Sequence, residues 1–378
     1  MFQKIKKLPL LIDALYLLVI YYFNKIGGKK VVFFYNLYEI HFSFIDSTLS
    51  TLSKNTSLKI IVINSFKFQD ESIYNIEQVY LPQSFLRFLK GDLLVTAASD
   101  LIKLNKIKKI VHFFHSPVST HFVYADNAFN NYDIFFCVGK QHEEELKRIF
   151  ELKGIQGKRY FQVGYGRLDL LIKEQKEYTK KYPQNTSVLI APSWHPENFI
   201  KLKGQDIIQN LLTRNFRVIF RPHPIAKLSQ PEVLERIYTL FGSNPLFNSD
   251  ESDKCKDNGE GEFNGLYESD VLISDWSGIS FEFVAVKEKP IVLINTPQKI
   301  NNSNPDAIGI EPIESFYRDK IGYLIGINDI NHIADYTSKC VEGEIPKSQL
   351  IEHIDQVFFK RDNFGKRASN IILELSKE

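Results

Sequence analysis

The segment at residues 269–295, SDVLISDWSGISFEFVAVKEKPIVLIN, constrains the fold more than any other part of the chain. Two short apolar runs flank a stretch in which Ile279, Phe283 and Val286 share one helical face. Continuous apolar runs are typical of strands buried on both faces of a parallel sheet. The segment therefore predicts a strand, a tight polar corner, a helix and a second strand.

The polar corner in this segment places Ser277 and Gly278 where the helix begins. The first backbone N–H groups of a helix have no partner within it, and the helix dipole is positive at that end. Such a corner suits a phosphate group. The alternative is an ordinary strand–helix–strand unit in which Ser277 is only an N-cap.

Strands and helices alternate along the rest of the chain, which implies parallel sheets. Apolar runs predict further strands at residues 31–35, 59–63, 93–96, 109–114, 134–138, 160–163, 188–191 and 216–220. A polar, charged stretch at 173–186 separates two similar halves, and 378 residues suffice for two cores. We expect an N-terminal helix (1–27), two Rossmann-like doubly wound domains (28–178 and 179–345) and C-terminal helices (346–378) that can return across the junction.

Composition excludes several classes of protein. The chain is 44% hydrophobic with a net charge of +2, which fits a globular protein without a nucleic-acid footprint. Cys137, Cys255 and Cys340 lie far apart without zinc-type spacing, so a reducing compartment is the simplest interpretation. The P-loop pattern is absent, and no Asp-x-Asp pair occurs that would hold Mg²⁺ on a nucleotide-sugar donor. We therefore expect neither a metal nor a cofactor.

The N-terminus combines lysines with an apolar stretch at residues 8–23. Tyr21, Tyr22 and Phe23 stand where a signal peptide would need small residues, and the stretch is too short for a spanning helix and contains Asp13. An interfacial helix at an anionic membrane surface fits these features. The alternative is a helix packed on the protein's own core.

Polar side chains follow the predicted strands, at the edge where open parallel sheets bind ligands. They are His115, Arg167, His195, Arg221, His223 and Asp275. Each could be a structural residue by itself, but their convergence at strand ends predicts a site. Arg221 and His223 suit a diphosphate, because guanidinium and imidazolium groups neutralise charge on a leaving phosphate.

Five ordered segments together resemble the CDP-glycerol glycerophosphotransferase family of teichoic-acid primases and polymerases. They are HSPVST at His115, VGYGRLDLL around Arg167, VLIAPSWHPE before and after His195, RVIFRPHP with Arg221 and His223, and SDVLISDWSGISFEF followed by KEKPIVL. The resemblance covers roughly residues 109–296 and implies a GT-B fold.

The resemblance also implies roles for these residues. His115 would be the general base that takes a proton from the acceptor hydroxyl, and His223 would act with Arg221 at the diphosphate. The remaining implied donor-binding residues are Arg167, His195, Asp275, Ser277, Gly278 and Glu282. Asp275 could instead orient the corner, and Glu282 could be an ordinary helix residue.

Three departures from the family pattern leave the donor open: Ser116 replaces a glycine, Gly278 a serine and Gly166 a proline. We expect a transferase at the cytoplasmic face of the membrane that moves a polyol phosphate from a CDP-activated donor to a polymer or lipid-linked hydroxyl. The alternatives are a glycosyltransferase of capsule, O-antigen or cell-wall synthesis and a non-catalytic GT-B-like scaffold.

Overall fold

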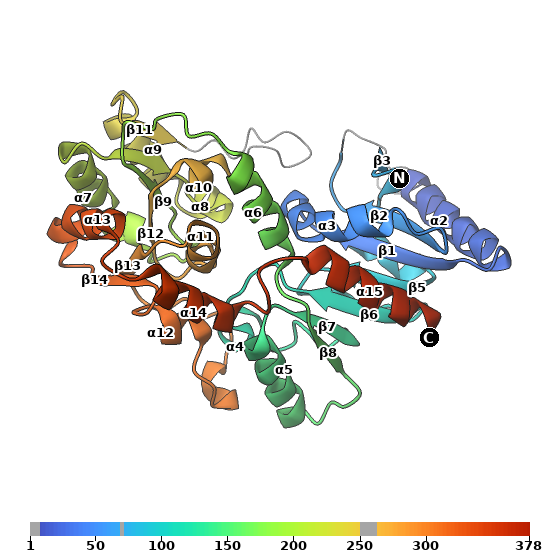
Figure 1. Ribbon diagram of the computed structural model, residues 1–378. Helices are drawn as coiled ribbons and strands as arrows, with labels where there is room; N and C mark the ends of the chain where they lie inside the picture. The colour runs from blue at the N-terminus through green and yellow to red at the C-terminus, as the bar shows by residue number, and fades with distance from the viewer. Residues whose placement is uncertain (1–7, 69–71, 250–262) are drawn as a thin grey trace.

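The N-terminal domain is built on an eight-stranded sheet of order β3-β4-β2-β1-β5-β6-β7-β8 (Figure 1). The computed structural model describes residues 8–68, 72–249 and 263–378. The strands are β1 (Lys30–Asn36), β2 (Leu58–Asn64), β3 (Ser72–Ile73), β4 (Ile76–Tyr80), β5 (Gly91–Thr96), β6 (Ile107–Phe113), β7 (Ile134–Cys137) and β8 (Arg159–Gln162). Neighbours among them pair in parallel except β3 with β4.

Helices cover this sheet because its central strands are apolar on both faces, as the almost fully buried β1 shows. They are η1 (Glu39–His41), α3 (Phe42–Leu52), η2 (Gln83–Phe88), α4 (Thr120–Val123), α5 (Lys140–Leu152) and α6 (Gly166–Glu177).

The C-terminal domain repeats the design on a six-stranded, all-parallel sheet of order β11-β10-β9-β12-β13-β14. Its strands are β9 (Ser187–Ile190), β10 (Arg217–Phe220), β11 (Phe247–Ser249), β12 (Val271–Ser274), β13 (Ile291–Asn295) and β14 (Gly322–Gly326). Its helices are α7 (Phe199–Thr213), α8 (Pro224–Ser229), α9 (Pro231–Phe241), α10 (Asn264–Glu268), α11 (Ile279–Lys287), η4 (Pro305–Ile308), α12 (Ile313–Tyr317), η5 (Ile330–His332) and α13 (Ile333–Glu342). The α/β class with two Rossmann-like parallel-sheet domains is therefore confirmed.

The strands expected from apolar runs are all present, whereas β3, β4, β11 and β14 were missed because they are short or partly exposed. The expected linker at 173–186 begins too early, since α6 continues to Glu177. That helix is charged along its exposed side and buries Leu168 and Leu171 on the other, so its polar end resembled a loop. The stretch at 242–265, rich in Ser, Asn, Asp and Gly, contains β11, and its residues 250–262, with Cys255, lie outside the described residues.

The C-terminal helices run back from the second domain to the first (Figure 1). α14 (Lys347–Val357) contacts α11 and α5, and α15 (Phe364–Lys377) packs along α3. Gly365 allows this packing, because a Cβ there would lie 2.5 Å from the backbone of Ser47. The chain therefore crosses the domain junction twice, through α6 and again before α15.

The N-terminal helix α2 (Leu8–Ile26) has two apolar sides with different environments. Ala14, Leu17 and Tyr21 are buried in the core of the N-terminal domain. Most of the other large apolar side chains of the helix are exposed: Leu11, Ile12, Leu15, Tyr16, Val19, Tyr22, Phe23 and Ile26. None of the helices in the described part of the chain combines the length and apolar character that crossing a bilayer requires. The prediction of a core-packed helix thus holds for one side, and the interfacial prediction stays open for the other.

Candidate active site

His115 lies two residues beyond the end of β6, on the loop that leads to α4. Its Nδ1 is 3.1 Å from the carbonyl oxygen of Ala97, the residue after β5. A carbonyl only accepts hydrogen bonds, so Nδ1 carries the proton and Nε2 keeps its lone pair. This tautomer is the one that a proton acceptor needs at Nε2.

The surroundings of His115 keep it neutral. Burial is the main cause that lowers its pKa to about 4, and the charges of Arg167 and Lys299 act in the same direction. The ring of His41 stacks on it, with centroids 5.3 Å apart and planes at 23°. His41 is itself buried, and its Nδ1 has no hydrogen-bond partner among the described residues. A neutral imidazole at this position can accept a proton at physiological pH.

Arg167 and Glu282 form an ion pair across the domain junction. Arg167 Nη1 is 3.4 Å from Glu282 Oε1, and both side chains are at least nine-tenths buried. The Tyr165 hydroxyl lies 2.6 Å from the same carboxylate oxygen and 3.0 Å from the His115 carbonyl oxygen. These contacts connect α11 to the backbone that carries His115. Donor binding by Arg167 and Glu282 stays a prediction, and in this structure the two side chains pair with each other.

Gly166, which departs from the family pattern, allows α6 to approach α3. A Cβ at this position would lie 1.9 Å from the carbonyl oxygen of Phe44. Phe44 in turn packs under Arg167, whose guanidinium carbon is 3.9 Å from the ring centroid. The glycine therefore has a packing reason that is local to this junction.

His223 caps the N-terminus of α8 in the C-terminal domain. Its Nδ1 accepts a hydrogen bond from the backbone N–H of Ile225 at 3.2 Å, so in the neutral ring Nε2 carries the proton. Burial, followed by the charges of Lys299 and Arg221, lowers its pKa to about 4. His223 is thus a neutral hydrogen-bond donor at Nε2, the opposite tautomer to His115.

Asp275 and His195 organise the loops at the ends of β12 and β9. Asp275 Oδ1 accepts a hydrogen bond from the Ser193 N–H at 2.7 Å, and burial raises the pKa of its carboxyl group. His195 Nδ1 accepts from the Glu197 N–H at 3.2 Å. The contact between Asp275 and Ser193 supports a positioning role for Asp275. Donor binding by Asp275 and His195 stays a prediction.

The corner with Ser277 and Gly278 lies directly against the loop of His115. A Cβ on Gly278 would be 2.8 Å from Ser116 Oγ and 3.1 Å from Pro117 Cδ. The start of the nine-residue helix α11 is therefore beside the loop that carries the candidate base. This contact joins two motifs that are more than 150 residues apart in the sequence.

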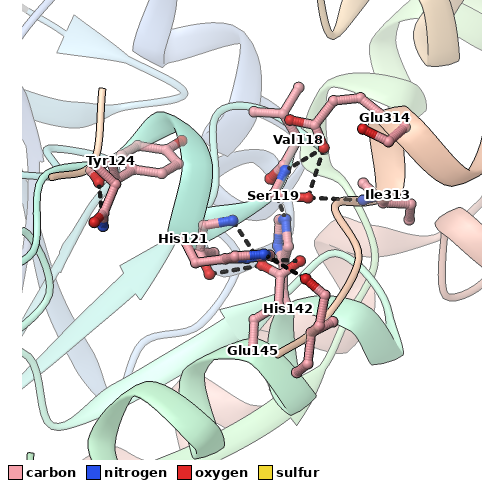
Figure 2. A network of polar contacts seen from close by, with 12 residues as sticks. Val118, Ser119, His121, Tyr124, His142, Glu145, Ile313 and Glu314 are labelled. Atoms are coloured by element: carbon pink, nitrogen blue, oxygen red, sulfur yellow. Dashed lines mark hydrogen bonds and ion pairs between the residues drawn. The ribbon is translucent and has the colours of Figure 1, made fainter. Parts of the chain in front are cut away.

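A buried network of hydrogen bonds, formed by the residues that follow this loop, connects the two domains (Figure 2). Ser119 donates from its N–H and its hydroxyl to Glu314 Oε2, at 3.0 and 2.6 Å, and accepts from the Ile313 N–H at 2.8 Å. His121 Nε2 is 2.9 Å from the Ile310 carbonyl oxygen. This network therefore holds the segment that follows His115 against the C-terminal domain.

Three residues at the site were missed by sequence reasoning: His41, Lys299 and Arg318. His41 and Lys299 follow β1 and β13, so the strand-end rule could have found them, although no motif marks either. Arg318 carries no such signal. Its guanidinium donates to the carbonyl oxygens of Asp275 and Ile294 at 3.0 and 2.9 Å, and thereby holds the corner.

The described residues contain no group of three or more His, Cys, Asp or Glu side chains that could hold a metal ion. Whether the protein works without a metal stays a prediction. The arrangement offers a proton acceptor beside a helix N-terminus at the domain junction, and a neutral imidazole donor that follows β10 in the same sheet as β12. These groups suit transfer of a phosphorylated unit between two oxygen atoms.

Comparison with known proteins agrees with this arrangement. The sequence profile of the CDP-glycerol:poly(glycerophosphate) glycerophosphotransferase family matches residues 118–299. The matched range contains His195, Arg221, His223 and the corner at Ser277 and begins three residues after His115. No curated protein matches the chain in sequence.

Solved structures with the same fold include the wall teichoic acid polymerase TagF, with a TM-score of 0.58 and 13% identity over 100% of this chain and 96% of that one. A putative UDP-N-acetylglucosamine 2-epimerase from Listeria monocytogenes has a TM-score of 0.57 and 13% identity, over 92% and 96% of the two chains. The UDP-GlcNAc 2-epimerase of Methanocaldococcus jannaschii has a TM-score of 0.55 and 13% identity, over 93% of this chain and 100% of that one. At such identities the likeness concerns the GT-B-like fold. The family match over residues 118–299, on this fold, confirms the resemblance, and the chain is a CDP-glycerol glycerophosphotransferase-like transferase.

Proposed function

We propose that the chain transfers a glycerol-phosphate or similar polyol-phosphate unit from a CDP-activated donor to a hydroxyl of a cell-surface polymer or lipid-linked acceptor. The observation that carries this proposal is the contact of Gly278 with Ser116. It sets the N-terminus of α11 beside the loop of His115. A phosphate at the helix N-terminus would then lie next to the candidate base.

The two histidines have complementary tautomers for this reaction. His115 Nε2 would accept the proton of the acceptor hydroxyl, whose oxygen forms a bond to the phosphorus that bears the polyol. The bond from that phosphorus to the CMP oxygen breaks, and CMP leaves with the electron pair. His223 Nε2–H would donate to an oxygen of the leaving phosphate, with Arg221 and the N–H groups of Ser277 and Gly278. In this mechanism protein groups stabilise the negative charge on the leaving CMP phosphate, without a metal.

The products of the reaction test the proposal. Wild-type protein with CDP-glycerol and a hydroxyl acceptor should release CMP and add glycerol phosphate to the acceptor. Release of a nucleoside diphosphate or monophosphate from a nucleotide-sugar, with sugar added to the acceptor, would support the glycosyltransferase instead. A scaffold would release nothing, and a cell would keep its surface polymer after His115→Ala and His223→Ala.

Calorimetry identifies the donor. CDP-glycerol, CDP-ribitol, CMP and UDP are compared on the wild type and on Arg221→Ala. We expect selective binding of cytidine nucleotides, weakened by about 1.5–3 kcal/mol in Arg221→Ala, which is the scale of a hydrogen bond to a charged group. A preference for UDP would contradict the CDP-activated donor.

We also propose that the exposed side of α2 attaches the protein peripherally to the cytoplasmic face of the membrane. Leu15, Val19 and Phe23 are 58–75% exposed on this side. Lys25 belongs to the last turn of this helix, and Lys90 lies beside it, with Nζ 3.0 Å from the Tyr22 hydroxyl. Apolar side chains bordered by lysines are typical of helices that bind anionic lipid surfaces. This placement would bring a lipid-linked acceptor to the enzyme.

A further inference from the structure

Lys299 lies on a segment that connects the two domains and carries no sequence motif. The segment follows β13, and both of its ends are fixed. Trp276 Nε1 donates to the Thr296 carbonyl oxygen at 2.8 Å, and the Asn301 N–H donates to the Phe122 carbonyl oxygen at 2.8 Å. The backbone of Lys299 is therefore held between the corner of the C-terminal domain and α4 of the N-terminal domain.

The side chain of Lys299 is largely buried and has no hydrogen-bond or ion-pair partner among the described residues. The residue is 7% exposed. Its nitrogen lies 5.3 Å from the ring centroid of Trp194. Burial lowers its pKa, and the charges of Glu314 and Asp275 counteract this effect. A cation in such a place is unfavourable until an anion completes it.

The same ammonium acts on both candidate histidines. Its positive charge lowers the pKa of His115 and that of His223, so it lies within electrostatic reach of both imidazoles. His115 is the proposed acceptor base and His223 the proposed donor to the leaving group. The phosphorus that changes partners must lie between these two groups. The hydrogen bonds that fix its segment place Lys299 between the corner of the C-terminal domain and α4, which follows the loop of His115. In the proposed mechanism the transferred phosphoryl group would lie at this junction.

We propose that Lys299 binds the phosphoryl group that is transferred, the one that carries the polyol, and so completes the donor site. This inference rests on the proposed function. The two phosphates of the donor would then be bound by different groups. Lys299 would bind the transferred phosphoryl group, and Arg221 and the N-terminus of α11 would bind the phosphate that departs with CMP. An anionic phosphoryl group would supply a partner for an ammonium group that has none among the described residues.

Lys299→Met tests the inference, since methionine has a similar length and no charge. We expect this variant to bind CDP-glycerol at least tenfold more weakly by calorimetry and to bind CMP within twofold of the wild type. CMP lacks the transferred phosphoryl group, so its binding also shows that the variant is folded. Because the substitution removes a charge that is largely buried and has no ion-pair partner among the described residues, the unfolding temperature should stay equal or rise.

Lys287→Met is the matched control. Lys287 is half-buried and, like Lys299, has a lowered pKa, of about 8, but its ammonium donates to the Tyr267 carbonyl oxygen at 2.8 Å. It lies at the last turn of α11, away from Ser277 and Gly278. We expect Lys287→Met to lower the unfolding temperature and to leave the affinities for CDP-glycerol and CMP unchanged.

The outcomes separate the two proposals. If the wild type neither binds CDP-glycerol nor releases CMP from it, the proposed function fails, and the inference on Lys299 fails with it. If the wild type does both, but Lys299→Met keeps its affinity for CDP-glycerol or loses affinity for CDP-glycerol and CMP equally, the inference alone is overturned. Selective loss of CDP-glycerol affinity supports both.

Discussion

Ser116 occupies the space that a serine at position 278 would need, because a Cβ on Gly278 would lie 2.8 Å from Ser116 Oγ. The family pattern has glycine after the base and a second serine in the corner, whereas this chain has serine and glycine at these places. The two departures are therefore complementary across one contact. In this chain the serine of the contact belongs to the N-terminal domain and the glycine to the C-terminal domain, which is the reverse of the family pattern. The two loops can therefore still approach each other closely.

Gly278→Ser should consequently destabilise the domain junction. The new side chain meets Ser116 Oγ and the rigid ring of Pro117, and overpacking of this kind costs about 1–3 kcal/mol. We expect a lower unfolding temperature and weaker binding of CDP-glycerol. Adding Ser116→Gly should restore part of both, with a coupling of about 0.5–3 kcal/mol in a double-mutant cycle. Strictly additive effects would show that the two positions do not share this space.

His115→Ala should remove transfer and spare donor binding. Loss of a general base typically costs about 10²–10⁴-fold in rate. The affinity for CDP-glycerol should change little, because His115 Nε2 faces the acceptor proton in the proposed mechanism. The measurement is kcat for CMP release together with calorimetry. His332→Ala, on an exposed side chain of the C-terminal domain, is the control and should match the wild type.

The pH dependence of transfer should reflect the low pKa of His115. Burial lowers that pKa from 6.5 to about 4, so the group loses its ability to accept a proton only as the pH falls through about 4. We expect the acid limb of kcat/KM, which reports the free enzyme, near pH 4. The limb of kcat should lie higher, because the negative donor raises the pKa of both histidines in the complex. An acid limb of kcat/KM near pH 6.5 would contradict a buried neutral base.

The exposed side of α2 can be tested by Leu15→Glu combined with Val19→Glu. Both side chains are more than half exposed, so the fold should tolerate the change. Binding to vesicles that contain anionic lipid should weaken at least about tenfold, because burial of each apolar side chain contributes about 1.5–3 kcal/mol. Turnover of a soluble acceptor should remain.

The control for α2 is Leu240→Glu, which changes a leucine on α9 of the other domain that is also more than half exposed. It should leave vesicle binding unchanged. Equal binding by the wild type and the α2 variant would argue that this helix does not contact the membrane.

The alternation of apolar runs with helical patterns predicted both parallel sheets, because a strand that is buried on both faces consists of consecutive apolar residues. Polar residues after those runs predicted where a site would form, since the carboxyl ends of parallel strands share one edge. His115, Arg221, His223 and the corner at Ser277 all follow from that reasoning. A strand without a continuous apolar run, such as β4, could not be predicted in this way.

The tertiary structure decided which of these residues meet. Contacts between distant segments produce the pair Arg167–Glu282 and the stack of His41 on His115. They also fix the tautomer of His115 and bury Lys299. The complementarity of Ser116 and Gly278 depends on them as well. Local periodicity records whether a side chain is buried, but the neighbour that it meets is set by how the two domains pack.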